Sequence, residues 1–252
     1  MIDEWFLAKL ENLARYELEI EGKPLSKEQY LKGKKLGYPD KALEKISGGS
    51  LTYHKDCVYK MVDTCGAEFK AETPYFYSTY DEHCEARELD KSDKKKIIVL
   101  GSGPIRIGQG IEFDYSCVHC VWTLKELGYE VIIINNNPET VSTDFDTGDR
   151  LYFEPLTNED VMNVIKAENP IGVVVAFGGQ TAIKLTKFLD KKGIKILGTS
   201  AESIDIAEDR ERFDELLEKY GIFRPKGESV MTLDEALTAA ERLEYPVLLR
   251  PS

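Results

Sequence analysis

The sequence lacks long apolar runs, paired cysteines and an excess of basic residues, and each absence excludes a class of protein. No apolar stretch approaches the roughly 20 residues of a membrane-spanning helix, and the first residues are acidic and amphipathic rather than signal-like. We therefore expect no membrane association. A net charge of −12 at pH 7 argues against nonspecific nucleic-acid binding. Five cysteines, an odd number spread along 252 residues, argue against a disulfide scaffold and favour a reducing, cytoplasmic setting.

The first 88 residues predict small helices followed by a connector. Apolar residues recur at helical spacing in WFLAKLENLARYELEI, Ser26 has the character of an N-cap, and Pro39-Asp40 begins a third helix. The segment 54–85 has no clear period, but its six aromatic residues predict an ordered connector that lies against another part of the protein. A polar run, ELDKSDKKK, follows and marks a domain boundary.

After this boundary, strand and helix patterns alternate. Strands are expected at IIVL, EVIIIN, RLYFEP, IGVVVAF and IKILG, with helices at 112–127, 159–169 and 180–193 between them. Short connections between such elements predict a parallel sheet with helices on both faces. Two further helices and the strand-like YPVLLRPS close the sequence. Because that strand stops abruptly, we expect more protein to belong here.

The loop GSGPIRIGQG follows the first of these strands and resembles a dinucleotide-binding loop only in part. Arg106 stands where the third glycine of that fingerprint belongs, and the next strand ends in Asn135-Asn136-Asn137 instead of an acidic residue. These departures make a nicotinamide-dependent oxidoreductase improbable. Two interpretations remain from the residues alone, an anion-binding loop and a glycine turn that lets the first helix pack.

Two further loops are expected at the same sheet edge. NNNPETVSTDFDTGDR places Glu139, Asp144, Asp146 and Asp149 after a strand, and FGGQT follows another. Open α/β sheets bind ligands at the carboxyl ends of their strands, although an acidic solvated loop and ordinary turns would look the same. CVHC at 117–120 falls inside a helix with no second pair nearby, so a zinc site is rejected.

These motifs together closely resemble the large subunit of carbamoyl phosphate synthase. The carrying residues are GSGPIRIGQGIEFDY, NNNPETVSTDFDTGDRLYFEPLT, FGGQTAIKL, GTSAESIDIAEDRERF and YPVLLRPS, with IDEWFL, VDTCGAEF and STYDEHCEA upstream. GIEFDY and NPETVSTD look like the second, carbamoyl-phosphate-synthetic half. The resemblance implies the end of a helical oligomerisation region with its connector at 1–88 and a Rossmann-like pre-ATP-grasp α/β domain, similar to the N-terminal domain of biotin carboxylase, at 89–213. The beginning of an ATP-grasp domain is implied at 214–252.

The same resemblance implies the site residues and the partners. Glu112 and Glu139 match carboxylates that line a tunnel for carbamate, with Arg106 as a candidate charge partner, and Arg250 matches an arginine that contacts ATP phosphate. ATP and Mg or Mn serve the whole enzyme, with metal ligands outside this chain. The implied partners are the rest of the large subunit, a glutamine amidotransferase small subunit, and a second copy bound through the helical region.

Since no complete catalytic set lies in this sequence, we expect the chain alone to be inactive. The alternative from another class is a standalone α/β module that binds or assembles with partners without catalysis.

Overall fold

The computed structural model describes residues 2–89, 92–106 and 108–249, and the chain divides into two compact units, Met1–Gly198 and Thr199–Ser252. The sequence-derived domain ranges, 1–88, 89–213 and 214–252, are not the same division and remain predictions.

The N-terminal helices of the first unit form a small core of their own. They are α1 (Glu4–Ile20), α2 (Lys27–Lys35) and α3 (Asp40–Ser47). Ser26 caps α2 as expected and forms a capping box with Gln29, which satisfies otherwise unpaired amide groups at the helix start. Tyr16, Ile20, Tyr30 and Leu43 form the core between the helices. The first turns of α1 do not share it, since Trp5, Phe6 and Leu10 are exposed.

A buried lysine joins these helices to the α/β part of the same unit. Lys34 Nζ lies 2.9 Å from Asp40 Oδ1 and also pairs with Glu159 at the start of α5 (Asn158–Glu168). Glu159 in turn accepts a hydrogen bond from the Asp40 backbone amide at 2.6 Å. Because the Lys34 side chain is almost fully buried, these two carboxylates compensate a charge that water cannot reach.

A seven-stranded sheet in the order β1-β2-β5-β4-β3-β6-β7 is the centre of the first unit. All neighbouring strands are parallel except β1 and β2, so the predicted parallel sheet is confirmed. The strands are β1 (Val58–Met61), β2 (Tyr75–Thr79), β3 (Lys96–Leu100), β4 (Glu130–Ile134), β5 (Arg150–Tyr152), β6 (Gly172–Val174) and β7 (Ile196–Leu197).

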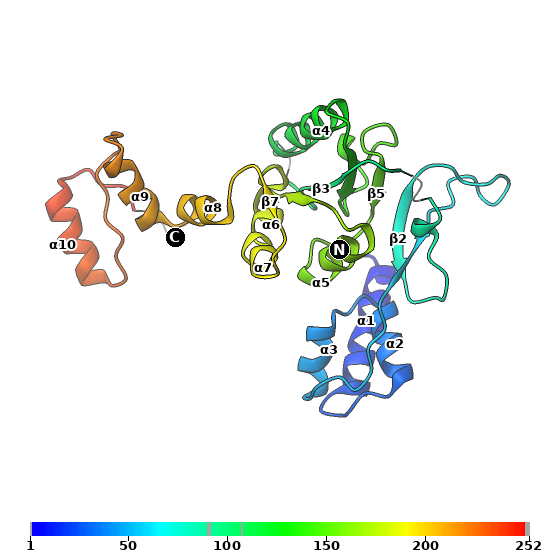
Figure 1. Cartoon of the computed structure of the whole chain (residues 1–252). Helices are drawn as coiled ribbons and strands as arrows, with labels where there is room; N and C mark the ends of the chain where they lie inside the picture. The colour runs from blue at the N-terminus through cyan, green and yellow to red at the C-terminus, as the bar shows by residue number, and fades with distance from the viewer. Residues whose placement is uncertain (1, 90–91, 107, 250–252) are drawn as a thin grey trace. The chain divides into compact units, whose positions relative to one another are not determined.

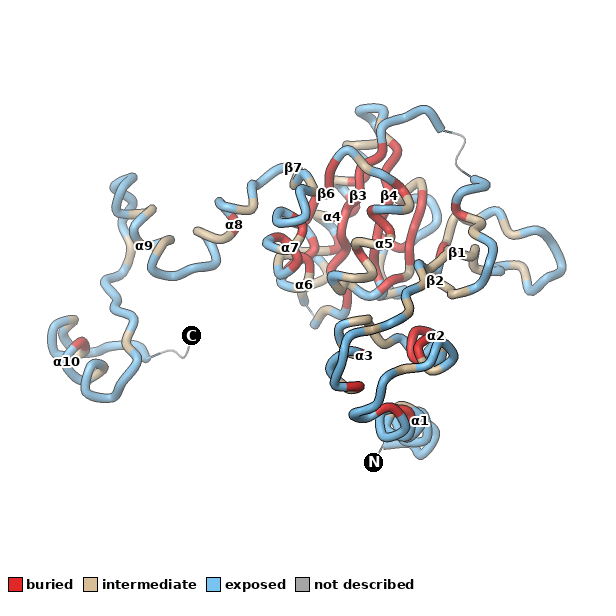
Figure 2. The backbone as a smooth tube through the Cα atoms, turned by 60° about the horizontal axis from the view of Figure 1, so that its bottom comes forward, coloured by how far each residue is buried: buried red, intermediate tan, exposed pale blue. Residues whose placement is uncertain are grey.

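Helices cover both faces of this sheet, as Figure 1 shows for α4 (Gly110–Glu126) and α5. Every residue of β3 and β4 is buried, and Ile97 and Val99 face the α4 residues Cys117 and Val121. Figure 2 shows the buried residues concentrated in these strands. The single helix expected at 180–193 is instead two short ones, α6 (Gly179–Ile183) and α7 (Thr186–Lys191). Between them Leu185 N bonds to Ala182 O, three residues back, which tightens the backbone locally.

The aromatic connector at 54–85 contains two strands that the sequence did not reveal. β1 and β2 form a hairpin-like antiparallel pair, and β2 pairs with β5, so this segment extends the main sheet. Phe76 stacks on Tyr152 at 5.2 Å between ring centroids, and Tyr59 meets the same ring edge-on at 4.7 Å. The strands are only four and five residues long, and they depend on β5 as a partner. The local sequence pattern does not predict this distant pairing.

Glu154 ties β2 to the end of β5. Its carboxylate accepts hydrogen bonds from the Ser78 backbone amide and from Ser78 Oγ, the latter at 3.0 Å. Burial raises the pKa of Glu154 to about 7, with repulsion from Asp160 adding to the effect. The buried carboxyl group therefore has a pKa close to neutral pH.

This raised pKa predicts that the protein loses stability as pH rises. The unfolded chain releases the Glu154 proton near the ordinary glutamate pKa of 4.5, whereas the folded chain holds it to about pH 7. The free energy of unfolding should therefore fall between these pH values, by on the order of 2–3 kcal/mol from this group. Urea denaturation from pH 5 to pH 8 measures the slope, which E154Q should flatten and the exposed E126Q should leave unchanged. An E154Q slope equal to that of the parent would contradict the assignment.

A buried charge network lies at the amino edge of the sheet, opposite the edge that carries the loops after β3 and β6. Glu168 at the end of α5 lies 2.9 Å from Lys96 Nζ and 3.1 Å from Arg150 Nη1, and it accepts a hydrogen bond from the Tyr152 hydroxyl. Arg150 Nε lies 3.0 Å from Glu130 Oε1, and Arg150 Nη1 donates to the Ala86 carbonyl at 3.0 Å. The network thus joins three strands, α5 and the segment before β3.

The second unit contains α8 (Ala201–Glu208), α9 (Arg210–Lys219) and α10 (Leu233–Leu243). The strand expected at YPVLLRPS is absent from its described part, residues 245–249. Leu248 and Leu249 are strongly exposed there, and no strand among the described residues supplies the hydrogen bonds that a strand needs. Across the described residues of both units, no helix is both long and apolar enough to cross a membrane.

Candidate functional site

The loops that follow β3 and β6 meet at the carboxyl edge of the sheet. The chain winds from β3 through β4 to β5 on one side and then returns to place β6 and β7 on the other side of β3. In open α/β sheets, ligands bind where the winding reverses in this way. The loops approach very closely, since a Cβ on Gly178 would lie 2.6 Å from the Gly101 carbonyl oxygen and 2.7 Å from that of Leu100. Only glycine at 178 permits this contact.

The turn after β4 joins the same edge through Asn135, whose side chain is fully buried. Its Oδ1 accepts hydrogen bonds from Gly103 N at 3.0 Å and Asn137 N at 3.3 Å. Its Nδ2 contacts Thr140 Oγ1 and Ser142 Oγ, each at 3.4 Å. One carboxamide therefore connects the glycine-rich loop to the turn that carries Glu139. The prediction that three loops gather at one sheet edge is confirmed in geometry.

The candidate tunnel carboxylates lie on two of these elements. Glu112 is in the first turn of α4 and Glu139 is in the turn after β4, and both are exposed. Arg106 is also exposed, and its backbone amide donates to Gln109 Oε1 at 2.9 Å. Within the described ranges, none of these three side chains forms a hydrogen bond or an ion pair, so Arg106 does not neutralise either carboxylate here. Their roles in a tunnel remain predictions, and Arg250 lies outside the described residues.

The acidic loop spans more of the sheet than the sequence suggested. Asp149 was expected with Glu139 at the carboxyl edge, but its carboxylate accepts from Val131 N at 2.8 Å, beside the start of β4. It also lies 3.7 Å from Lys125 Nζ. Because β4 and β5 are parallel, the connection between them must return to the amino edge. Asp149 therefore belongs to the opposite edge. In the part of the chain that the structure describes, no group of three or more acidic, histidine or cysteine side chains could hold a metal ion.

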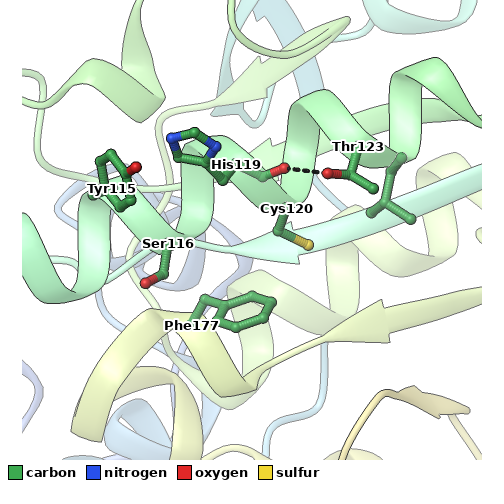
Figure 3. A pocket seen from close by; sticks show the side chains of 7 residues that line it. Tyr115, Ser116, His119, Cys120, Thr123 and Phe177 are labelled. Atoms are coloured by element: carbon green, nitrogen blue, oxygen red, sulfur yellow. Dashed lines mark hydrogen bonds between the residues drawn. The ribbon is translucent and has the colours of Figure 1, made fainter.

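The CVHC segment divides between the core and the surface of α4. Cys117 packs against the sheet, and burial raises the pKa of its thiol to about 12. His119 is exposed and lies between two rings, tilted against Tyr115 at a centroid distance of 4.2 Å and edge-on to Trp122 at 5.3 Å. Figure 3 shows His119, Cys120 and Phe177 around a surface pocket of about 470 Å³. Cys117 and His119 point to opposite sides of the helix and cannot share a metal.

Sequence reasoning missed the two residues that shape this site most directly. Asn135 entered only as evidence against a dinucleotide fold, and Asp114 was not singled out. The available signal was a polar residue at the end of an entirely apolar buried strand, and an aspartate one turn inside a helix on its buried side. Both patterns predict a side chain that bonds to nearby backbone.

Two family models match the chain. One, for the carbamoyl phosphate synthase preATP-grasp domain, covers residues 93–206, and the other, for the carbamoyl-phosphate synthetase large chain oligomerisation domain, covers residues 1–62. Among solved structures, the biotin carboxylase domain of 2-oxoglutarate carboxylase from Hydrogenobacter thermophilus is 20% identical, with a TM-score of 0.46. That match covers 61% of this chain and 34% of the other.

Curated relatives match over the whole chain. The carbamoyl phosphate synthase large chain of Lachnoclostridium phytofermentans is 54% identical over 261 residues, which covers 100% of this chain and 24% of that protein. The large chain of Caldanaerobacter subterraneus subsp. tengcongensis is 55% identical over 259 residues, with the same coverage. The chain thus spans about a quarter of the length of these relatives. It belongs to the carbamoyl phosphate synthase large-chain family and contains its preATP-grasp domain and a part matching its oligomerisation domain.

Proposed function

We propose that this chain is part of a carbamoyl phosphate synthase large subunit, within the half that phosphorylates carbamate. In that reaction one ATP activates bicarbonate, and ammonia derived from glutamine reacts with the activated bicarbonate to give carbamate. A second ATP then phosphorylates carbamate to carbamoyl phosphate. The product would supply pyrimidine and arginine synthesis in the cytoplasm. The observation that carries the proposal is the identity of 54% over the entire chain. The ranges 1–88, 89–213 and 214–252 would be the oligomerisation region with its connector, the pre-ATP-grasp domain and the beginning of an ATP-grasp domain.

The carboxyl-edge site fits a passage better than a nucleotide pocket. Glu112 and Glu139 are exposed carboxylates without a cationic partner among the described residues, and such groups would repel a triphosphate. We therefore assign the binding of ATP, with Mg or Mn, to residues other than the described ones. Arg250 would be one of the residues that contact ATP. Carboxylates would also repel anionic carbamate, so this lining suits an intermediate that crosses as neutral carbamic acid. Partners would be the rest of the large subunit, the amidotransferase subunit and a second copy bound through the helical region.

A hybrid large chain tests this function. In it, our 252 residues replace the matching segment of the Lachnoclostridium phytofermentans large chain, and carbamoyl phosphate formation is measured with ATP, bicarbonate and ammonia. We expect the hybrid to retain activity within about tenfold of the parent large chain, since more than half of the replaced residues are identical. The 252-residue chain alone should form no product. A folded but inactive hybrid, or turnover by the chain alone, would contradict the proposal. Inactivity with retained self-association would favour the assembly module.

A further inference from the structure

Asp114 connects the two elements that carry the candidate tunnel carboxylates. It lies two residues after Glu112 on α4, and its side chain is almost fully buried, with 7% of the residue exposed. Its Oδ2 accepts a hydrogen bond from Val141 N at 2.8 Å, and its Oδ1 accepts one from Ser142 N at 3.2 Å. Val141 lies two residues after Glu139, at the start of a short 3₁₀ helix, Val141–Thr143. One buried carboxylate thus fixes the first turn of α4 against the turn after β4.

The side chains of Glu112 and Glu139 have no partner among the described residues. No hydrogen bond or ion pair with another described residue fixes either carboxylate, and both side chains are exposed. Their positions therefore depend on what fixes the backbone beneath them. Asn135 ties the turn to the glycine-rich loop, and Asp114 ties it to α4 itself. A hydrogen bond from a backbone amide to a carboxylate oxygen is among the stronger ones in proteins.

We propose that Asp114 is a positioning residue that holds Glu112 and Glu139 in register across the passage for the reaction intermediate. This inference rests on the proposed function, since it concerns the same site. Asp114 touches no reacting group and acts only through the two backbone amides that it binds. Its loss should therefore let the intermediate escape before the second phosphorylation, while the first ATP-consuming step continues.

The test measures coupling in the hybrid large chain. We expect D114N, which loses one acceptor oxygen and turns an amide NH₂ toward a backbone N–H, to lower carbamoyl phosphate formation by about ten- to a hundredfold. Bicarbonate-dependent ATP hydrolysis should stay within about twofold of the parent, so that more ATP is hydrolysed per product. A merely structural role would lower both rates together and leave this ratio unchanged. E126Q makes the same chemical change at an exposed position of α4 that forms no side-chain bond with another described residue, and it should leave the ratio as it is.

A second variant decides the question if D114N does not fold. V141P removes the N–H that Asp114 binds and keeps the carboxylate, and proline suits the first position of a helical turn after the extended Thr140. Compared with V141A, which keeps the amide, V141P should also raise the ATP hydrolysed per product. If D114N and V141P, or whichever of the two folds, hydrolyse as much ATP per product as the parent hybrid, the positioning role is overturned and the proposed function stands. An inactive parent hybrid would overturn the proposed function, and the positioning role with it.

Discussion

Replacing Arg150 by methionine is expected to lower the free energy of unfolding by about 3–5 kcal/mol. Arg150 is buried, and it compensates the carboxylates of Glu130 and Glu168 at the amino edge of the sheet. Methionine fills a similar volume but leaves Glu130 without a cationic partner among the described residues, while Glu168 keeps Lys96. A charge buried without compensation costs several kcal/mol, because neither water nor a counter-charge stabilises it. Urea denaturation of the chain at pH 7 measures the loss.

Two variants show whether charge or packing causes this loss. R15M removes an arginine from the exposed pair with Glu11, where the side chains are 74% and 57% exposed, and should cost less than about 1 kcal/mol. R150M/E130M removes the orphaned carboxylate together with its partner and should recover part of the stability. If the double variant is less stable than R150M by the full cost of a second core substitution, the loss comes from packing and the electrostatic explanation is wrong.

Alanine at Gly178 should disturb the candidate site itself, with a loss of about 3 kcal/mol or more in the free energy of unfolding. The added Cβ would lie 2.4 Å from Ala182 Cβ and within 2.7 Å of two backbone carbonyl oxygens, so the loops after β3 and β6 must separate. Backbone cannot yield as a flexible side chain can. The same substitution should lower product formation by the hybrid large chain, because the glycine-rich loop and α4 move with the Gly101 backbone.

The matched control is Gly110, at the start of α4. A Cβ there meets only Ile105 Cδ1, at 3.8 Å, which is an ordinary contact. G110A should be neutral or slightly stabilising, since alanine has the higher helix propensity. Equal stability of G178A and G110A, measured by thermal and urea denaturation, would show that the two loops do not depend on their close approach.

Parts of the fold follow from local sequence because local forces determine them. Ser26 and Gln29 cap α2 through bonds between near neighbours, and the apolar runs at β3 and β4 can be stable only as buried strands. The alternation of strands and helices then requires parallel pairing, with loops gathered at one edge. For this reason the residue pattern alone places the three loops of the site together.

Other parts depend on partners far away in the chain. β1 and β2 are strands because β2 pairs with β5 and because Tyr59 and Phe76 pack against the ring of Tyr152. Conversely, YPVLL has the composition of a strand, but no described strand lies beside it. Asp149 lies at the opposite edge because the return of a parallel connection is a property of the sheet rather than of its own loop.

The sequence by itself determined the family, the α/β class and the identity of the candidate residues, since these depend on motifs and periodicity. Only the tertiary structure decided what holds those residues. Asp114 binds amides 27 and 28 positions away, and Asn135 binds Gly103 from 32 positions away. Contacts of this kind arise when a sheet brings separate loops to one edge, and buried polar groups must then find whichever partners the fold places beside them.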